Sequence, residues 1–162
     1  MSETAIYAGG CFWGVQYFFD DCPGVIETEV GYMGGLLENP TYQQVSAGNS
    51  GHFEVVKVEF DPKEISYKNL TKYFFEIHDP TQANGQGADI GDQYLSAIFY
   101  QNDEQKAIAM DLIKDLKSRG LDVVTEVIPT MRFWYAEDHH QSYYAKNGEP
   151  PQCHKRVERF ED

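Results

Sequence analysis

Basic side chains are scarce in this sequence of 162 residues, because 13 lysines and arginines stand against 26 aspartates and glutamates, for a formal net charge of −13. Electrostatic repulsion between such an acidic chain and a polyanion disfavours nucleic acid as a partner. The sequence also lacks any apolar stretch near the ~18 residues that a membrane-spanning helix needs. We therefore expect a protein that acts with neither nucleic acid nor a membrane.

Cysteine is also rare, with 3 residues in the chain, too few to suggest a disulfide framework. The sequence opens on a strand-like segment and not on the basic and then apolar leader of a secreted protein. We therefore expect a cytoplasmic protein whose thiols are kept reduced or are used in turnover. No repeat or linker divides the sequence, so residues 1–162 are expected to form one domain and a monomer, with a mobile C-terminal tail at about 145–162.

Hydrophobic patterns predict the elements of this domain. Strands are expected at about residues 4–8, 25–32, 53–60, 95–100 and 122–128. Helices are expected at about 66–79, at about 103–119 and directly after Cys11. Because these elements interleave without a regular βαβ repeat, the predicted fold class is α+β, a two-layer sandwich with a mixed β-sheet and long loops.

Cys11 is the most informative residue of the sequence. It lies in the motif Gly9-Gly10-Cys11-Phe12-Trp13-Gly14, directly after an apolar run at residues 5–8. A strand that ends in two glycines and then turns leaves the thiol at a helix start, beside unpaired N–H groups and the positive end of the helix dipole. Such a position favours the thiolate and can lower the thiol pKa from about 8.5. We interpret Cys11 as a nucleophile, and burial as a structural cysteine is the ordinary alternative.

Glu54 is the second candidate. Strand alternation places it on the same face as Val56 and Phe60, which is the more apolar face of the segment 53–60. A carboxyl group there either finds a hydrogen-bonding partner or shifts its pKa upward and stays protonated near neutral pH. A protonated carboxyl group is a proton donor. The alternative is an exposed residue at a strand end with an ordinary pKa.

A reactive cysteine, a protonated carboxyl group and aromatic neighbours suit a reaction in which sulfur attacks an electrophile while an acid protonates its oxygen. Further motifs in the sequence match one known pattern. They are Gly10-Cys11-Phe12-Trp13-Gly14, Val30-Gly31-Tyr32 with Gly34-Gly35, Asn39-Pro40-Thr41-Tyr42, Gly51-His52-Phe53-Glu54-Val55-Val56, Asp89-Ile90-Gly91-Asp92-Gln93-Tyr94 with Ser96-Ala97-Ile98, and Glu137-Asp138-His139-His140-Gln141. Over nearly its whole length the chain resembles the peptide methionine sulfoxide reductase A family, whose members reduce one sulfoxide epimer of methionine.

The resemblance implies a fold related to the ferredoxin-like one and a role for each matched residue. Cys11 is expected to attack the sulfoxide sulfur, and Glu54 to protonate the departing oxygen. Tyr42 and Tyr94 are expected to hydrogen-bond that oxygen, and Asp89 to order the site. The products are then a sulfenic acid on the cysteine and methionine, free or in a protein, which implies protein repair and defence against oxidative stress.

The same resemblance assigns the remaining candidates. Phe12 and Trp13 are expected to bind the terminal methyl group of the substrate. Cys153 is expected to resolve the sulfenic acid as a disulfide, although it lacks the Gly-Tyr-Cys context of many family members. Cys22 is the competing resolver, but its surroundings favour burial. The implied electron donor is thioredoxin, or dithiothreitol in vitro, with no metal and no organic cofactor.

Two other classes of function stay open on the residues alone. Cys11 and His52 could form a thiol hydrolase pair, although no third group is evident that would orient the imidazole. A zinc site in the tail could use His139, His140, Cys153 and His154, a spacing that matches no common zinc pattern. A strict requirement for dithiol excludes the hydrolase, and the zinc content of the purified protein tests the metal site.

Overall fold

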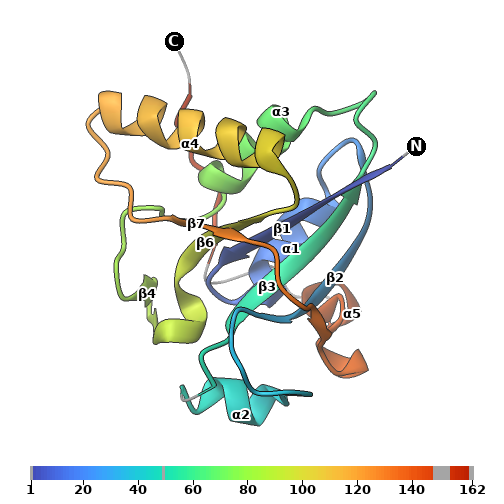
Figure 1. Cartoon of the computed structure of the whole chain (residues 1–162). Helices are drawn as coiled ribbons and strands as arrows, with labels where there is room; N and C mark the ends of the chain where they lie inside the picture. The colour runs from blue at the N-terminus through green and yellow to red at the C-terminus, as the bar shows by residue number, and fades with distance from the viewer. Residues whose placement is uncertain (1, 49, 148–153, 161–162) are drawn as a thin grey trace.

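The structure is a computed structural model that describes residues 2–48, 50–147 and 154–160. Its main sheet has the strand order β7-β6-β1-β3-β2-β8 (Figure 1). Among the described strands of this sheet, β6 and β7 pair in parallel and all other neighbours pair antiparallel. The strands are β1 Glu3–Gly9, β2 Val25–Met33, β3 Phe53–Phe60, β6 Ser96–Tyr100, β7 Glu126–Pro129 and β8 Trp134–Tyr135. The predicted mixed sheet is confirmed.

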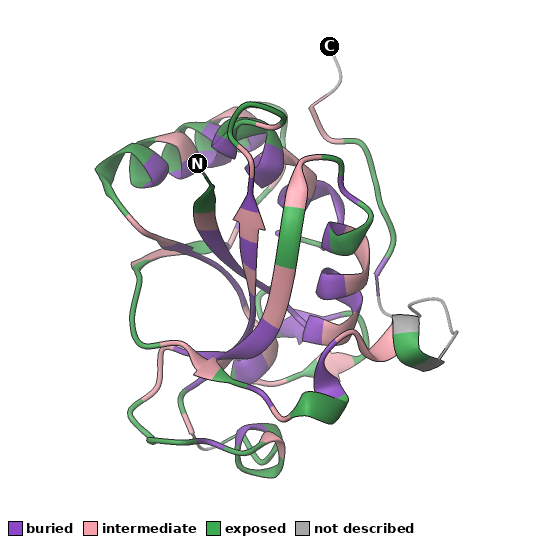
Figure 2. Ribbon diagram, turned by 90° about the vertical axis from the view of Figure 1, so that its right-hand side faces the viewer, coloured by how far each residue is buried: buried purple, intermediate pink, exposed green. Residues whose placement is uncertain are grey.

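Three longer helices cover one face of this sheet. They are α1 Phe12–Asp20, α3 Tyr67–Glu76 and α4 Asp103–Ser118. Their inward side chains, such as Phe19, Phe74 and Leu116, join strand residues in one large apolar cluster, and a smaller cluster covers the opposite face. Figure 2 shows the buried residues on the strands and on the inward faces of the helices. The two-layer α+β fold is confirmed. Within the described ranges, none of the helices has the length and apolarity needed to cross a membrane.

The predicted strand at 122–128 is wrong in its first half, since β7 begins only at Glu126. The preceding residues bond to other parts of the chain. The backbone N–H of Val124 donates to the carbonyl of Pro80 at 2.8 Å, and the hydroxyl of Thr125 lies 2.7 Å from that of Ser96. Because Pro80 is not part of the sheet, the backbone of Val124 bonds outside the sheet ladder.

Short elements in the long loops were not predicted. They are α2 Tyr42–Ser46, β4 Gly85–Gln86, β5 Asp89–Ile90, the 3₁₀ helices η1 Asp92–Tyr94 and η2 Asp138–His140, and α5 Tyr143–Asn147. Several of them carry candidate site residues.

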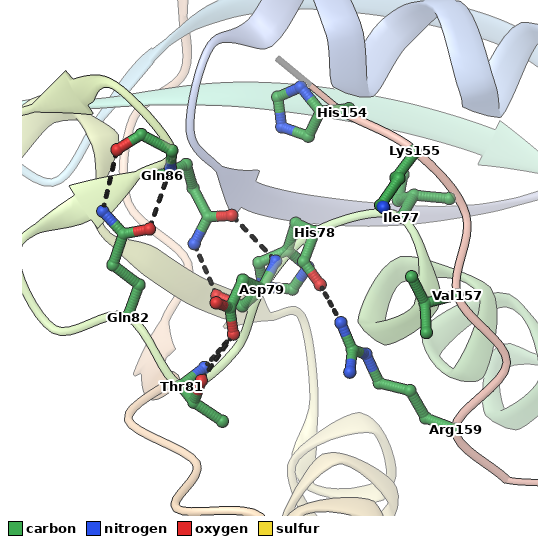
Figure 3. Close-up of a pocket in the computed structure, with 11 residues that line it drawn as sticks. Ile77, His78, Asp79, Thr81, Gln82, Gln86, His154, Lys155, Val157 and Arg159 are labelled. Atoms are coloured by element: carbon green, nitrogen blue, oxygen red, sulfur yellow. Dashed lines mark hydrogen bonds between the residues drawn. The ribbon is translucent and has the colours of Figure 1, made fainter.

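The described part of the expected C-terminal tail, residues 154–160, lies along the end of α3. Arg156 donates to the Glu76 carboxylate at 2.9 Å, and the Val157 N–H donates to the Glu76 carbonyl at 2.7 Å. Arg159 donates to the His78 carbonyl at 3.2 Å, as Figure 3 shows. Residues 154–160 are therefore packed against the domain.

Candidate active site

Cys11 lies where β1 leads into α1. Gly10 has a φ of +92°, which favours glycine, and a Cβ at this position would collide with the side chain of Gln86. The chain turns there, and Cys11 follows as the N-cap residue of α1, with its side chain partly exposed. Its thiol is therefore close to the unpaired N–H groups and the positive dipole end of the helix. The predicted position at a helix start is observed.

Glu54 approaches the same helix end from β3. Its side chain is 1% exposed. Its Oε1 accepts a hydrogen bond of 3.1 Å from the backbone N–H of Phe12, the first residue of α1. This N–H has no acceptor within the helix, because it belongs to the first turn. The carboxyl group is thus bonded to the residue that follows Cys11.

Tyr42, Tyr94 and Asp89 reach this position from three short elements, α2, η1 and β5. Burial, followed by the nearby Glu54 carboxyl group, raises the pKa of Tyr42 to about 12. Burial and the same carboxyl group raise the pKa of Tyr94 well above its ordinary value. Cys11 and Asp89 raise both pKa values further, so these groups share one site. Both phenols stay protonated at neutral pH and can donate hydrogen bonds.

Glu137 is a residue of this site to which the sequence assigned no role. Its Oε2 accepts a hydrogen bond of 3.2 Å from the backbone N–H of Tyr42, and its Oε1 accepts one of 3.3 Å from the hydroxyl of Tyr32. Tyr32 is itself the register partner of Glu54 across β2 and β3. Desolvation opposes the ionisation of Glu137, but hydrogen bonds from its own N–H and from Tyr42 outweigh it and lower its pKa. The one sequence signal for it was its place in the motif 137–141.

Aromatic rings form a wall next to Cys11. Phe12 is fully buried, with its ring centroid 6.2 Å from that of Tyr42. Trp13 is partly buried and stacks on Tyr143 at a centroid distance of 3.9 Å. Its indole N–H donates to Nδ1 of His140 at 3.2 Å. Burial lowers the pKa of His140, so its neutral ring can accept this bond. The indole is therefore fixed on two sides.

Cys22 and Cys153 are the other two cysteines of the chain. Cys22 is buried, as expected, and burial raises the pKa of its thiol to about 11. Cys153 lies outside the described residues.

Neither alternative function gains support from the contacts of its residues. His52 accepts a hydrogen bond from the Gly35 N–H at 3.1 Å through Nδ1, and its Nε2 lies 2.7 Å from the Leu37 carbonyl oxygen. Its ring is thus bonded to the loop at 35–37. Nε2 of His154 donates to the Gly9 carbonyl at 2.6 Å. No group of three or more potential metal ligands is found in the part of the chain that the structure describes.

Comparisons with a family profile and with known sequences all point to the same family. The family profile described as "Peptide methionine sulfoxide reductase" matches residues 3–162. The peptide methionine sulfoxide reductase MsrA of Methanosarcina acetivorans is 50% identical over 149 residues, which cover 90% of this chain and 79% of the relative. The protein of the same name from Pasteurella multocida is 47% identical over 154 residues, with coverages of 94% and 88%.

Two solved structures are also similar. The reduced form of Mxr1 from Saccharomyces cerevisiae has a TM-score of 0.88 and 32% sequence identity, and the match covers 97% of this chain and 93% of that chain. A structure of Mxr1 in complex with Trx2 has a TM-score of 0.63 and 23% identity, with coverages of 97% and 91%, and shows likeness of fold alone.

Proposed function

The chain belongs to the peptide methionine sulfoxide reductase family, and we propose that Cys11 and Glu54 carry out the reaction of this family together. The reaction is the thiol-dependent reduction of methionine S-sulfoxide, free or in a protein, to methionine. The observation that carries the proposal is the hydrogen bond between the Glu54 carboxyl group and the Phe12 N–H, because it joins the acid to the helix that Cys11 caps.

The proposed step transfers one oxygen atom and two electrons. The Cys11 thiolate attacks the sulfoxide sulfur and forms an S–S bond with it, while Glu54 delivers a proton to the oxygen and the S–O bond breaks, which releases hydroxide. The hydroxide then attacks the Cys11 sulfur and the S–S bond breaks, so methionine leaves as the thioether and the cysteine becomes a sulfenic acid. The substrate is reduced and the cysteine is oxidised. Tyr42 and Tyr94 donate hydrogen bonds to the oxygen as negative charge develops on it. Asp89 orders this part of the site.

The substrate methyl group is proposed to bind against Trp13 and Phe12. The aromatic surface suits a small apolar group, and the His140 bond keeps the indole in one orientation. Binding at this wall places the sulfoxide sulfur next to Cys11.

Resolution is proposed to use Cys153, which condenses with the sulfenic acid to a disulfide and releases water. Cys22 is a poor candidate, because the nine-residue helix α1, about 14 Å long, separates it from Cys11 and its thiol is buried. Thioredoxin is the proposed reductant of the disulfide, and the yeast relative in complex with Trx2 supports it. We further propose that the protein works as a monomer in the cytoplasm, without metal or organic cofactor.

The test uses resolved sulfoxide epimers with dithiothreitol. We expect the parent protein to consume the S epimer alone, and Cys11→Ser to consume neither. Equal loss of both epimers, or activity in the serine variant, would contradict the proposal. With thioredoxin as reductant, Cys153→Ser should stop after one stoichiometric round of methionine formation, and Cys22→Ser should turn over as the parent does. The opposite pattern would make Cys22 the resolver.

A further inference from the structure

Three glycines of the motif around Cys11 form a notch in the surface of the chain. They are Gly9 and Gly10 before the cysteine and Gly14 after it. A Cβ at Gly14 would collide with the imidazole of His154, and a Cβ at Gly10 would lie 3.5 Å from the Nε2 of this ring. The Gly9 carbonyl accepts a hydrogen bond of 2.6 Å from the same Nε2. We call this space the glycine notch, and the imidazole of His154 fills it.

His154 is held in the glycine notch by burial and by the segment that follows it. Its side chain is 7% exposed. Further along the segment, the guanidinium groups of Arg156 and Arg159 donate hydrogen bonds to groups at the end of α3. The segment 154–160 is therefore fixed at two places, at the start of α1 through His154 and at the end of α3 through the two arginines.

Cys153 is the residue directly before His154. It lies outside the described residues, but the peptide bond fixes its Cα about 3.8 Å from that of His154. Cys11 is in the same way one peptide bond from Gly10, on the other side of the contact. The Cα atoms of two cysteines must come within about 4.4 to 6.8 Å of each other to form a disulfide. An anchored His154 therefore limits how far the thiol of residue 153 can move from Cys11.

We propose that His154 is a positioning residue for the second half of the reaction, because its imidazole in the glycine notch holds the adjacent Cys153 within reach of the Cys11 sulfenic acid. The proposal rests on the proposed function, in which Cys153 is the resolving cysteine, and adds the residue that keeps this cysteine in place. It explains why the motif around Cys11 has glycine at each position that the imidazole contacts.

The step that His154 serves is the formation of the disulfide. The Cys153 thiolate attacks the sulfur of the sulfenic acid, the S–S bond forms as the S–O bond breaks, and the departing hydroxide takes up the thiol proton and leaves as water. The thiol sulfur is oxidised and the sulfenic sulfur is reduced, so the step needs no other oxidant. His154 has no chemical part in it and acts by raising the effective concentration of the thiol.

The test follows the two halves of the reaction separately. Reduced protein is mixed with methionine S-sulfoxide without reductant, and samples are quenched over time with dimedone, which labels sulfenic acids. Mass spectrometry then measures methionine, labelled Cys11 and the Cys11–Cys153 disulfide. In His154→Ala we expect methionine to form within about twofold of the parent rate. We expect the disulfide to form about tenfold more slowly, with labelled Cys11 in the meantime.

Further variants separate positioning from a general effect of the substitution. His154→Gln keeps an N–H that can reach the Gly9 carbonyl and should recover most of the disulfide rate, whereas the shorter His154→Asn should not. This pair makes the same comparison if His154→Ala does not fold. Lys155→Ala is the control within the same segment and should behave as the parent does, because this exposed side chain lines the pocket of Figure 3 and is not in the glycine notch.

The outcomes distinguish this proposal from the proposed function. Disulfide formation at the parent rate in His154→Ala and His154→Asn would overturn the role of His154 and leave Cys153 as the resolver. Equal slowing of methionine formation and disulfide formation would also overturn it, since the residue would then support the whole site. A parent protein that forms methionine but no Cys11–Cys153 disulfide would contradict the proposed resolver, and the role of His154 with it.

Discussion

At the scale of single residues, the two carboxyl groups of the site have different surroundings. Glu137 accepts hydrogen bonds at both oxygens, and its pKa is lowered. Glu54 is buried, which favours the neutral form of a carboxyl group, and its Oε1 accepts the Phe12 N–H. A proton on Oε2 is compatible with that bond. The surroundings therefore suit Glu137 as a fixed anion and Glu54 as the acid.

Glu54→Gln tests this assignment. The amide oxygen can still accept the Phe12 N–H, so the free energy of unfolding should change little, but an amide cannot deliver the proton. We expect the rate constant of methionine formation to fall by a factor of about 10² to 10⁴. The rate of methionine formation in a single turnover measures it, with urea unfolding in parallel. Glu59→Gln changes a partly exposed carboxyl group on the same strand, is the matched control and should keep the parent rate. A parent-like rate in Glu54→Gln would exclude it as the acid.

The sequence could predict the position of Cys11 at a helix start and that of Glu54 on a buried strand face because the information is local. Two glycines before a cysteine predict the turn, and strand alternation predicts the buried face. Glu137 could not be found this way, because its partner Tyr42 is 95 positions away and only the folded chain brings them together. The same holds for the stacking of Trp13 on Tyr143.

At the scale of elements, length decides what a pattern can predict. The helices α3 and α4 are long enough for apolar periodicity, and both were predicted closely. The five-residue helix α2 has no such periodicity, although Thr41 and Gln44 form a capping box with bonds of 2.9 and 3.2 Å. That spacing is a local signal for the start of α2.

Helix α1 meets the C-terminal segment at Gly14. A Cβ at Gly14 would collide with the imidazole of His154, which is buried and bonded to the Gly9 carbonyl. Glycine is therefore needed here for close approach and not for its backbone freedom. We expect Gly14→Ala to destabilise the parent protein by about 1 to 3 kcal/mol, as overpacking does.

In a His154→Ala background the sign should reverse. The collision is then absent, and alanine in a helix interior is more stable than glycine by about 1 kcal/mol. Urea unfolding of the two single variants and the double variant measures the coupling. If Gly14→Ala destabilises both backgrounds equally, His154 does not occupy this position.

At the scale of the whole molecule, a buried series of side-chain hydrogen bonds joins segments that are distant in the sequence. His78, at the end of α3, lies with Nδ1 2.7 Å from the Phe74 carbonyl and Nε2 2.7 Å from the Ser96 hydroxyl of β6. The Ser96 hydroxyl in turn contacts Thr125 before β7. Burial lowers the pKa of His78 to about 3, despite the bond to Phe74. With the imidazole neutral, Nδ1–H donates to the Phe74 carbonyl and Nε2 accepts from the Ser96 hydroxyl.

This neutral histidine makes the stability of the molecule depend on pH. Its pKa is about 3 in the folded state and about 6.5 in the unfolded state, so between these values the unfolded chain binds a proton that the folded one does not. Stability therefore falls as the pH drops through 6.5 toward 3. From pH 7.5 to pH 5 we expect a loss of about 2 kcal/mol from His78 alone. Urea unfolding at both values measures it.

His78→Asn separates this contribution from that of other groups. Asparagine does not titrate, so the variant should be less stable than the parent at pH 7.5 but should lose about 2 kcal/mol less between pH 7.5 and 5. His139→Asn removes an exposed imidazole and controls for the loss of a histidine as such, so its slope should stay closer to that of the parent than the slope of His78→Asn does. His140, whose pKa is lowered by burial and by its neighbour His139, keeps both surroundings in His78→Asn and therefore cancels in the comparison of that variant with the parent. A parent-like slope in His78→Asn would mean that His78 is not held neutral by its burial.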